Sequence, residues 1–358
     1  MKKEKKQKSG RKKKVFFRIG ICFLSLILIL VSGIYGALSI IYYGPSVSAR
    51  NTFTATVIET SALKFIARMF LSEEEIAQIV GNDDHSVNVE ITRTDIIDIE
   101  YQAEQSTTEN AENKPFDKNA IEIIDISGRT YNGKLMIVND PKRISIGTPK
   151  DGYGEDKKGM TTLNMVKYSN CIAGVNGGGF EDIGGLGSGG VPFGRRESGV
   201  VISKGELLWG SLSKKYEMIG FNSKGIMVLG TMTAQQALDM DIKEALNFGP
   251  YLILNGKPYD AIGEYESGLN PRTAIGQRKD GAVLLLVVNG RQSNSLGATY
   301  EDLIEIMVEY GAVNAANLDG GSSSCMIYNN ELITTPGSLY GPRKMATNIL
   351  VSRIEEGD

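Results

Sequence analysis

The chain has 358 residues, enough for one core-forming domain with further segments, and it is rich in glycine (42 residues). Its net charge of −3 is unevenly divided, because residues 1–18 carry +9 and the remainder therefore carries −12. The acidic remainder argues against nucleic acid as a partner, and a single histidine, His85, argues against a catalytic triad or a histidine-based zinc site.

Residues 19–43 form an uncharged apolar segment directly after the basic tail. As a helix this segment extends about 37 Å, which is enough to cross a bilayer. The positive-inside rule then predicts a single-pass protein of the cell membrane, with residues 1–18 in the cytoplasm and the C-terminal part outside. A cleaved signal peptide ending near Ser46–Ala49 is the alternative, but the apolar run is longer than a normal signal requires.

Residues 44–99 are predicted to form a helical lead-in to the folded domain. Apolar residues recur at helical spacing between 53 and 80, and Ser72 with Glu75 forms a capping box for a second short helix. These helices are expected either to lie on the membrane or to pack on the domain. Residues 100–118 are acidic and polar, which predicts a linker.

Residues 119–358 are predicted to form an α+β domain, a mixed β-sheet structure with a few packed helices. The run 282–288 is apolar throughout, which indicates a central strand covered on both faces. Capping boxes start helices at Thr233 and Thr299, which we expect to run to about 247 and 310. Other strands are expected near 121–126, 135–138, 171–175, 200–202, 207–208, 251–254, 273–276, 313–318, 325–328 and 349–351.

Two cysteines, Cys171 and Cys325, lie in apolar strand-like stretches of this domain. Outside a cell they could form a disulfide, and as two buried small hydrophobic residues they would fit equally well. The chain has no CxxC motif, so a thiolate metal site is not expected.

A glycine-rich segment follows the predicted strand 171–175. It begins with Asn176, Gly177 and Gly178. Glycines at this position allow the backbone to approach a ligand closely or to form an anion-binding nest. An ordinary glycine-rich turn is the alternative interpretation.

Two arginines lie at strand ends. Arg272 and Thr273 begin a strand after Pro271, and Gly290 and Arg291 follow the apolar strand 282–288. The planar guanidinium group matches phosphate or carboxylate in a bidentate manner, so each arginine is a candidate anion ligand. A surface ion pair and a solvated turn are the respective alternatives.

The fourth candidate segment ends the strand 313–318. It contains Asn317, Asp319, Gly320, Gly321 and Ser322. A carboxylate at a strand end is suited to general acid–base chemistry or to a hard cation such as Ca²⁺. The alternative is a turn in which Asp319 binds its own backbone. No other cofactor is expected.

The order of these four segments resembles the phosphodiester glycosidase family, over roughly residues 120–353. The resemblance implies hydrolysis of the bond between a sugar's anomeric carbon and a phosphodiester oxygen, and bacterial members of the family are often exopolysaccharide-related. By position it implies catalytic roles for Asp319, Arg272 and Arg291. Substrate-binding roles are implied for Asn176, Gly177, Gly178, Thr273, Gly290, Asn317, Gly320, Gly321 and Ser322.

Two positions depart from the family's pattern. Asn289 stands where the third motif usually has an aspartate, and Ser322 stands where the fourth usually has a third glycine. If the missing acid were catalytic, the domain would instead be a non-catalytic glycan-binding or polysaccharide-assembly module. This module is the alternative to a membrane-anchored enzyme that acts on a cell-envelope or exopolysaccharide glycan.

The chemistry that the resemblance implies needs no histidine. Arg272 and Arg291 would hold the phosphodiester anion and stabilise the leaving phosphate, while Asp319 would activate water or stabilise positive charge at the anomeric carbon. Weaker candidates for a second carboxylate are Glu181, Asp182 and Glu197.

Overall fold

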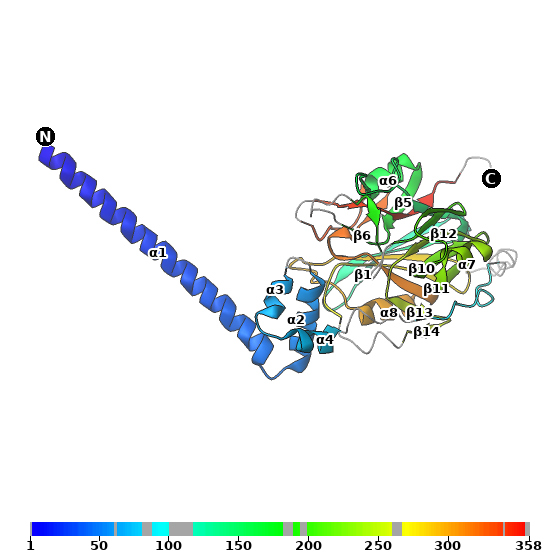
Figure 1. Cartoon of the computed structure of the whole chain (residues 1–358), viewed down its shortest axis with the longest axis horizontal. Coiled ribbons are helices and arrows are strands. Elements are labelled where there is room, and N and C mark those ends of the chain that lie inside the picture. Colours follow the sequence, from blue (N-terminus) through cyan, green and yellow to red (C-terminus); the bar gives the residue numbers. More distant parts are fainter. Residues whose placement is uncertain are drawn as a thin grey trace, which may run out of the picture.

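The computed structural model shows a long N-terminal helix, a small group of helices and a β-rich domain (Figure 1). Side chains are described from residue 16 onward. The described residues are 2–60, 63–80, 88–99, 117–181, 189–193, 199–259, 267–338 and 341–354. The predicted linker falls almost entirely on residues 100–116, and His85 also lies outside the described part of the chain.

The first helix, α1 (Lys2–Tyr43), contains the predicted apolar segment. Its stretch Phe16–Tyr43 is long and apolar enough to cross a membrane, a property that signal sequences share. Three short helices follow as α2 (Val47–Glu59), α3 (Lys64–Arg68) and α4 (Glu73–Val80). Helix α2 begins earlier than the predicted residue 53, because the Ser46 hydroxyl accepts a hydrogen bond from the Ala49 N–H and caps it.

Helices α2 to α4 pack with the end of α1 around a small hydrophobic cluster of their own. Tyr42 of α1 stacks on Phe70, with ring centroids 4.6 Å apart. The predicted capping box starts α4, since the Ser72 N–H donates to Glu75 at 2.8 Å and the Glu75 N–H donates to the Ser72 hydroxyl at 3.2 Å. The end of α1 and the helical lead-in are therefore one packed unit.

The last part of the lead-in is extended rather than helical. Residues 89–92 lie along β11 (Met227–Thr233), where the Thr92 N–H donates to the Leu229 carbonyl and the Thr231 N–H donates to the Val89 carbonyl. Strand β11 is the last strand of its sheet. The segment satisfies backbone groups that this edge would otherwise expose.

In the described part of the domain, the strands form three larger sheets and two small ones, and every strand pair is antiparallel. The seven-stranded sheet has the order β1 (Ile121–Ser127), β2 (Asn132–Val138), β16 (Val283–Val288), β15 (Arg272–Arg278), β17 (Ala312–Leu318), β13 (Tyr251–Leu254) and β14 (Lys257–Pro258).

One five-stranded sheet has the order β11, β10 (Lys215–Asn222), β12 (Ile242–Asn247), β8 (Val201–Ser203) and β9 (Glu206–Trp209). The other has the order β19 (Glu331–Leu332), β18 (Met326–Tyr328), β5 (Cys171–Asn176), β21 (Asn348–Ser352) and β3 (Ile144–Gly147). The small pairs are β20 (Lys344–Met345) with β4 (Met160–Thr161), and β6 (Phe180–Glu181) with β7 (Val191–Pro192).

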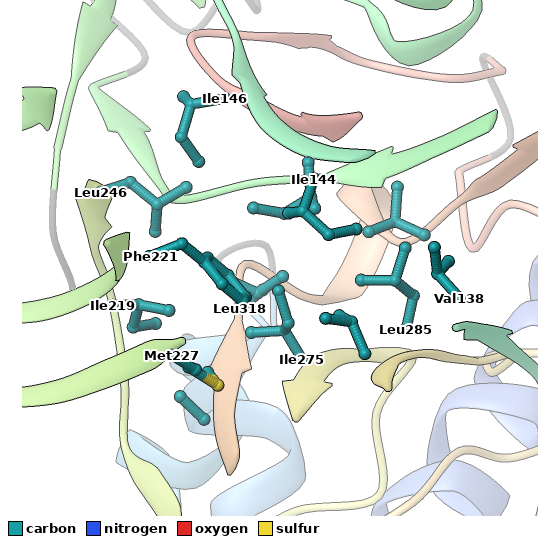
Figure 2. Close-up of a cluster of buried hydrophobic side chains, with 14 of the residues drawn as sticks. Val138, Ile144, Ile146, Ile219, Phe221, Met227, Leu246, Ile275, Leu285 and Leu318 are labelled. Atoms are coloured by element: carbon teal, nitrogen blue, oxygen red, sulfur yellow. The ribbon is translucent and has the colours of Figure 1, made fainter. Parts of the chain in front are cut away.

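The central core lies between the three larger sheets, each of which contributes one face (Figure 2). Leu285 of β16, Phe221 of β10 and Ile144 of β3 meet there. Alternate residues of β16 point to the opposite face, where Leu284 and Leu286 pack beneath α8 (Tyr300–Glu309). Strand β16 is thus covered on both faces, as its unbroken apolar sequence predicts.

Short helices cover the outer faces of the sheets. Helix α8 has the predicted capping box of Thr299 and Asp302. The Thr233–Gln236 box is also present, but its helix α7 ends at Asp239, and the prediction of a helix to 247 is wrong. Asp241 adopts a left-handed backbone conformation (φ 61°), and the following residues form the buried strand β12. Helix α6 (Thr162–Tyr168) packs on β5.

Cys171 and Cys325 are both buried free thiols. The Cys325 sulfur lies 3.1 Å from the Thr162 hydroxyl oxygen. Of the two arrangements left open by the sequence, the structure contains the unpaired one.

Replacing Leu285 with alanine is expected to lower the free energy of unfolding by about 2 to 5 kcal/mol, the usual cost of such a cavity in a closely packed core. Leu285 is fully buried between the sheets. Leu212→Ala is the matched control, because Leu212 is 46% exposed. Denaturant unfolding of both variants checks this, and a similar loss in both would contradict the central position of Leu285.

Candidate functional site

The register of the sheets brings the predicted motifs to one place. Arg272, the first residue of β15, pairs with Val288 at the end of β16, and Thr273 pairs with Leu318 at the end of β17. The segments after β16 and β17 therefore leave the seven-stranded sheet beside the start of β15. The first motif reaches the same place from the end of β5 in a neighbouring sheet.

Asn176 connects three of these motifs and is fully buried. Its side-chain oxygen accepts hydrogen bonds from the Thr273 hydroxyl at 2.8 Å and from the Cys325 N–H at 3.1 Å. Its side-chain nitrogen donates to the Asp319 carbonyl oxygen at 2.5 Å. A buried amide with these partners fixes the relative positions of β5, β15 and the segment after β17.

Two of the backbone N–H groups in the predicted anion nest, those of Gly177 and Gly178, are already used within the protein. The Gly177 N–H donates to the Thr347 carbonyl, and the Gly178 N–H donates to the Thr347 hydroxyl at 3.0 Å. A Cβ atom at Gly177 would lie 2.7 Å from that hydroxyl oxygen. These glycines therefore permit close packing of β5 against residue 347.

Pro271 is the contact point for two further glycines. A Cβ atom at Gly290 would lie 2.6 Å from the Pro271 nitrogen, and one at Gly320 would lie 2.9 Å from its carbonyl oxygen. The Gly321 N–H donates to the same carbonyl at 2.7 Å. The second, third and fourth motifs therefore pack backbone against backbone. A side chain at Gly290 or Gly320 would leave no room for this contact.

Asp319 is the carboxylate of this site. Its N–H donates to the Gly177 carbonyl at 3.1 Å, and one of its carboxylate oxygens accepts from the Gly320 N–H at 3.0 Å. Burial raises the pKa of Asp319 to about 6, against the opposing effects of a hydrogen bond from Ser323 and the charge of Arg343. A carboxyl group with this pKa exchanges protons near neutral pH, as a general acid or base requires.

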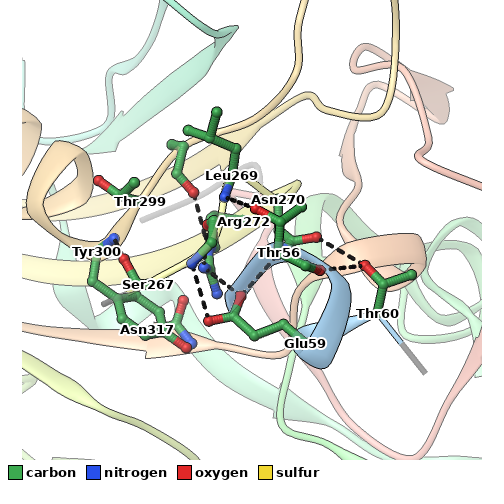
Figure 3. A network of polar contacts seen from close by, with 12 residues as sticks. Thr56, Glu59, Thr60, Ser267, Leu269, Asn270, Arg272, Thr299, Tyr300 and Asn317 are labelled. Atoms are coloured by element: carbon green, nitrogen blue, oxygen red, sulfur yellow. Dashed lines mark hydrogen bonds and ion pairs between the residues drawn. The ribbon is translucent and has the colours of Figure 1, made fainter. Parts of the chain in front are cut away.

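Arg272 is buried beneath α2 and bound on several sides (Figure 3). Its guanidinium group donates to the Gly268 carbonyl at 2.7 Å, to the Ala298 carbonyl at 3.1 Å and to Glu59 at 2.7 Å, and it lies 4.1 Å from the centre of the Tyr300 ring. Burial by itself lowers the pKa of Arg272, but the charge of Glu59 opposes this and the pKa is raised.

Arg291 lies beside Arg272 and is held by a polar contact with the lead-in. Its guanidinium group donates to the Thr60 hydroxyl at 3.0 Å and to the Asn270 side-chain oxygen at 3.2 Å. Its two terminal nitrogen atoms would lie 3.2 and 3.5 Å from a Cβ atom at Gly321, so the guanidinium group also packs against the fourth motif. Burial and the charge of Arg272 lower the pKa of Arg291, and Glu59 partly offsets this effect.

The end of α2 is tightly docked on the loop before β15. The Leu269 N–H donates to the Thr56 hydroxyl at 2.9 Å, and the Asn270 amide donates to Glu59 at 2.8 Å. A Cβ atom at Gly268 would lie 2.3 Å from the Thr56 Cα atom. Sequence reasoning missed Glu59, because an isolated acidic residue at the end of a helix carries no motif.

Arg343 is a second residue that sequence reasoning missed. Its guanidinium group lies over the ring of Phe180, 4.7 Å from the ring centre, and its charge acts on Asp319. The only signal in the sequence was the phenylalanine of the first motif. The pairing of Phe180 with an arginine more than 160 residues away depends on the tertiary fold.

Of the two departures from the family pattern, the structure explains one. Asn289 holds neighbouring loops, since its side chain donates to Asn132 at 2.7 Å and accepts from the Thr335 N–H at 2.9 Å. Ser322 lies half-buried in a 3₁₀ turn, Gly321–Ser323, and nothing in the structure explains why this position is serine.

Of the remaining candidate residues, Asn317 lies in the core and Glu181 lies on the surface. Asn317 is buried and donates to the Gly249 carbonyl at 2.9 Å, while its side-chain oxygen has no hydrogen-bond partner among the described residues. Glu181 is exposed in β6, and both Asp182 and Glu197 lie outside the described residues.

The site as described does not fit a calcium ion. Calcium takes six to eight oxygen ligands, usually including several carboxylates. In the described ranges no three histidine, cysteine or acidic side chains gather as a metal site. The Asn176 side-chain oxygen already accepts two hydrogen bonds, and the cationic groups Arg291 and Arg343 lie on this site.

A sequence profile of the phosphodiester glycosidase family matches residues 169–352, just over half of the chain, and this range includes all four motifs. The chain belongs to the phosphodiester glycosidase family. The mouse N-acetylglucosamine-1-phosphodiester alpha-N-acetylglucosaminidase is 26% identical over 58% of this chain and 42% of its own length. The uncharacterized prophage protein YomE of Bacillus subtilis is 30% identical over 49% of this chain and 27% of its own length.

The catalytic domain of the zebrafish N-acetylglucosamine-1-phosphodiester alpha-N-acetylglucosaminidase, auto-inhibited by its pro-peptide, has a similar fold. It superimposes with a TM-score of 0.53 and 23% identity, over 66% of this chain and 83% of that domain. The chain thus has the family's fold, but spans less than half the length of the curated relatives it matches.

Replacing Asp319 with asparagine is expected to change how stability depends on pH. With a pKa of about 6 when folded and about 4 when unfolded, Asp319 binds more protons in the folded state between these values. The wild-type protein therefore loses stability as the pH rises through this window, by up to about 3 kcal/mol for a two-unit shift.

Urea unfolding of the full chain in detergent, at pH 4.5 and pH 7.5, measures this loss. Asp319→Asn should show a smaller loss than the wild type. Equal pH dependence in the two proteins would show that burial does not raise the pKa of Asp319.

Proposed function

We propose that this protein is a membrane-anchored, extracytoplasmic phosphodiester glycosidase that hydrolyses a sugar-1-phosphodiester bond in a cell-envelope or exopolysaccharide glycan. The single observation that carries the proposal is that a carboxyl group and a guanidinium group meet at the segment after β17. A half-buried carboxyl group with a raised pKa, Asp319, lies on the same segment as Gly321, against which the Arg291 guanidinium packs. This combination suits cleavage of an anionic glycoside.

The charges of the site fit a phosphodiester. Such a group carries one permanent negative charge, and Arg291 can bind it through two parallel hydrogen bonds. Arg272 adds a second positive charge to this region. Its charge lowers the pKa of Arg291 through repulsion, so the two guanidinium groups are close enough to interact electrostatically. An anion placed beside both groups relieves that repulsion.

Asp319 is proposed to act as the base in the hydrolysis. Water attacks the anomeric carbon, the bond from that carbon to the phosphate oxygen breaks, and its electron pair leaves with the phosphate group. Asp319 accepts the proton of the attacking water, and the arginines stabilise the leaving phosphomonoester. Ionised Asp319 is needed, so activity should rise as the pH passes through about 6.

The membrane anchor and the export of the domain rest on the N-terminal sequence. The basic tail precedes the apolar helix, and residues 16–35 of this helix are all exposed, as a lipid-facing helix would be. This arrangement favours an outer location for the domain and for its substrate.

Helix α2 is proposed to cover the site. The Glu59 carboxylate is bound to Arg272, and Thr60 is bound to Arg291, so the lead-in occupies hydrogen-bonding positions that an anionic substrate would use. The zebrafish catalytic domain is auto-inhibited by a pro-peptide. Here the covering segment belongs to the lead-in that joins α1 to the domain.

A non-catalytic binding module was the alternative that Asn289 suggested. The asparagine is engaged with Asn132 and Thr335, so the residue at this position serves to hold loops together. The presence of Asp319, Arg272 and Arg291 favours the enzyme over the binding module.

An assay of the full chain in detergent against sugar-1-phosphodiesters tests the enzyme. Asp319→Asn is expected to lower kcat by about 10² to 10⁴, the usual contribution of a general base. Arg291→Ala should lower kcat/KM by about 10² to 10³ through lost stabilisation of the phosphate. Arg278→Ala, at the opposite end of β15, is the control and should keep wild-type activity.

Turnover in Asp319→Asn at the wild-type rate would exclude the mechanism. Glycan binding without turnover in the wild type, with the protein shown to be folded, would support the binding module instead.

Glu59→Gln is expected to raise kcat/KM by about tenfold. A charge-assisted hydrogen bond contributes about 1.5 to 3 kcal/mol, and 1.4 kcal/mol corresponds to a factor of ten, so weakening the contact with Arg272 favours displacement of α2 by substrate. The control is Glu73→Gln, which removes an exposed ion pair with Arg68. A lower rate in Glu59→Gln would mean that α2 supports the site rather than covering it.

A further inference from the structure

Exposed apolar side chains gather where the chain leaves α1. Tyr43 and Val47 are exposed at the connection between α1 and α2, and Leu63 precedes α3. In α3 the side chain of Phe65 is 59% exposed, and Met69, which follows this helix, is 60% exposed. These two residues are four positions apart and so lie on one side of the turn, which we call the α3 face.

The α3 face is left open by the rest of the fold. Phe70 and Ala67 of the same segment point into the helical cluster, while Phe65 and Met69 do not belong to its buried core. Helix α2 contacts the loop before β15 through Thr56 and Glu59, so the lead-in meets the β-rich domain on a different side. Large apolar side chains left exposed together mark an interaction surface.

The position of this surface along α1 can be estimated from aromatic contacts. Phe70 lies 5.5 Å from Tyr35 and 4.6 Å from Tyr42 by ring centroids, and its carbonyl accepts a hydrogen bond from the Tyr43 hydroxyl. The segment after α3 therefore lies alongside the last two turns of α1 and not beyond its end.

Those last turns lie at the level of the lipid headgroups if α1 spans the membrane. The apolar stretch of 28 residues is about 42 Å long as a helix, whereas the hydrocarbon core is about 30 Å thick. The excess of about 12 Å corresponds to about eight residues, which are Gly36 to Tyr43 when the hydrocarbon core begins at Phe16. Tyrosine is enriched at this level of a bilayer.

Basic residues flank the α3 face. Lys64 and Arg68 are four positions apart in α3, directly next to Phe65 and Met69 in sequence. Arg68 has a mostly exposed ion pair with Glu73 at 2.9 Å. Apolar side chains bordered by lysine and arginine are typical of helices that lie in the interface of an anionic membrane.

We propose that the α3 face, formed by Phe65 and Met69, lies in the outer headgroup region of the bilayer that α1 crosses. The proposal rests on the proposed membrane anchor and goes beyond it, because it assigns a lipid contact to the globular part of the chain. The bilayer then holds the helical cluster at two places, through α1 and through α3.

Fluorescence quenching in vesicles tests this contact. The full chain, with its single tryptophan removed by Trp209→Phe, is reconstituted in vesicles of equal parts phosphatidylcholine and phosphatidylglycerol with brominated acyl chains. Phe65→Trp and, separately, Met69→Trp are added to this background. Each is expected to lose most of its fluorescence and to emit at a shorter wavelength than in unbrominated, lipid-free detergent.

Two further variants separate the possible failures. Met240→Trp places the probe after α7, on the side of the domain away from α1 (Figure 1), and should not be quenched. Leu28→Trp places it within α1 and reports membrane insertion of the anchor. Quenching at Leu28 but not at Phe65 or Met69 would overturn the proposal and leave the anchor intact. No quenching at Leu28 would overturn both.

Discussion

The buried charge of Arg272 is the constraint on which the arrangement of the site depends. A guanidinium group stays charged in a protein, and burying it without partners would cost several kcal/mol. The chain supplies two carbonyl oxygens from its own domain, and the remaining charge is balanced by Glu59 from α2. The lead-in is therefore held at the site by electrostatics as well as by packing.

This ion pair changes the electrostatics of its neighbours. The charge of Arg272 lowers the pKa of Arg291, and Glu59 partly compensates. If α2 moves away, two adjacent guanidinium groups lose their only carboxylate partner among the described residues, and their repulsion favours any anion that binds between them. The Arg272–Glu59 ion pair thus stabilises the arrangement in which α2 covers the site. Separating this pair would leave the two arginines as an anion-binding site.

Local patterns in the sequence were sufficient to predict much of the fold. The capping boxes at Ser72, Thr233 and Thr299 mark helix starts because both hydrogen bonds form within four residues. Strand β16 could be recognised because burial on both faces requires apolar residues throughout. The helix predicted to reach Asn247 failed, since nothing apolar distinguishes the left-handed turn at Asp241 from a continuing helix.

The candidate site was predictable only in part. Asn176, Arg272, Arg291 and Asp319 were found because each follows or begins a strand within a motif, and the sheet register brings such ends together. Glu59 and Arg343 were not found, because their roles arise from contacts across more than 160 residues of sequence. The role of Gly177 and Gly178 in packing also requires knowledge of Thr347.

The lead-in connects the membrane segment to the site through a short and stiff path. Only three residues separate α1 from α2, and the 13 residues of α2 span about 20 Å. The middle of α2 packs against Tyr42 through Phe53, and its C-terminal end binds Arg272 and lies beside Arg291. Because α2 is a short helix held both by α1 and by the site, it couples the position of the site to the end of α1. Displacing α2 from Arg272 would therefore also alter the position of the domain relative to α1.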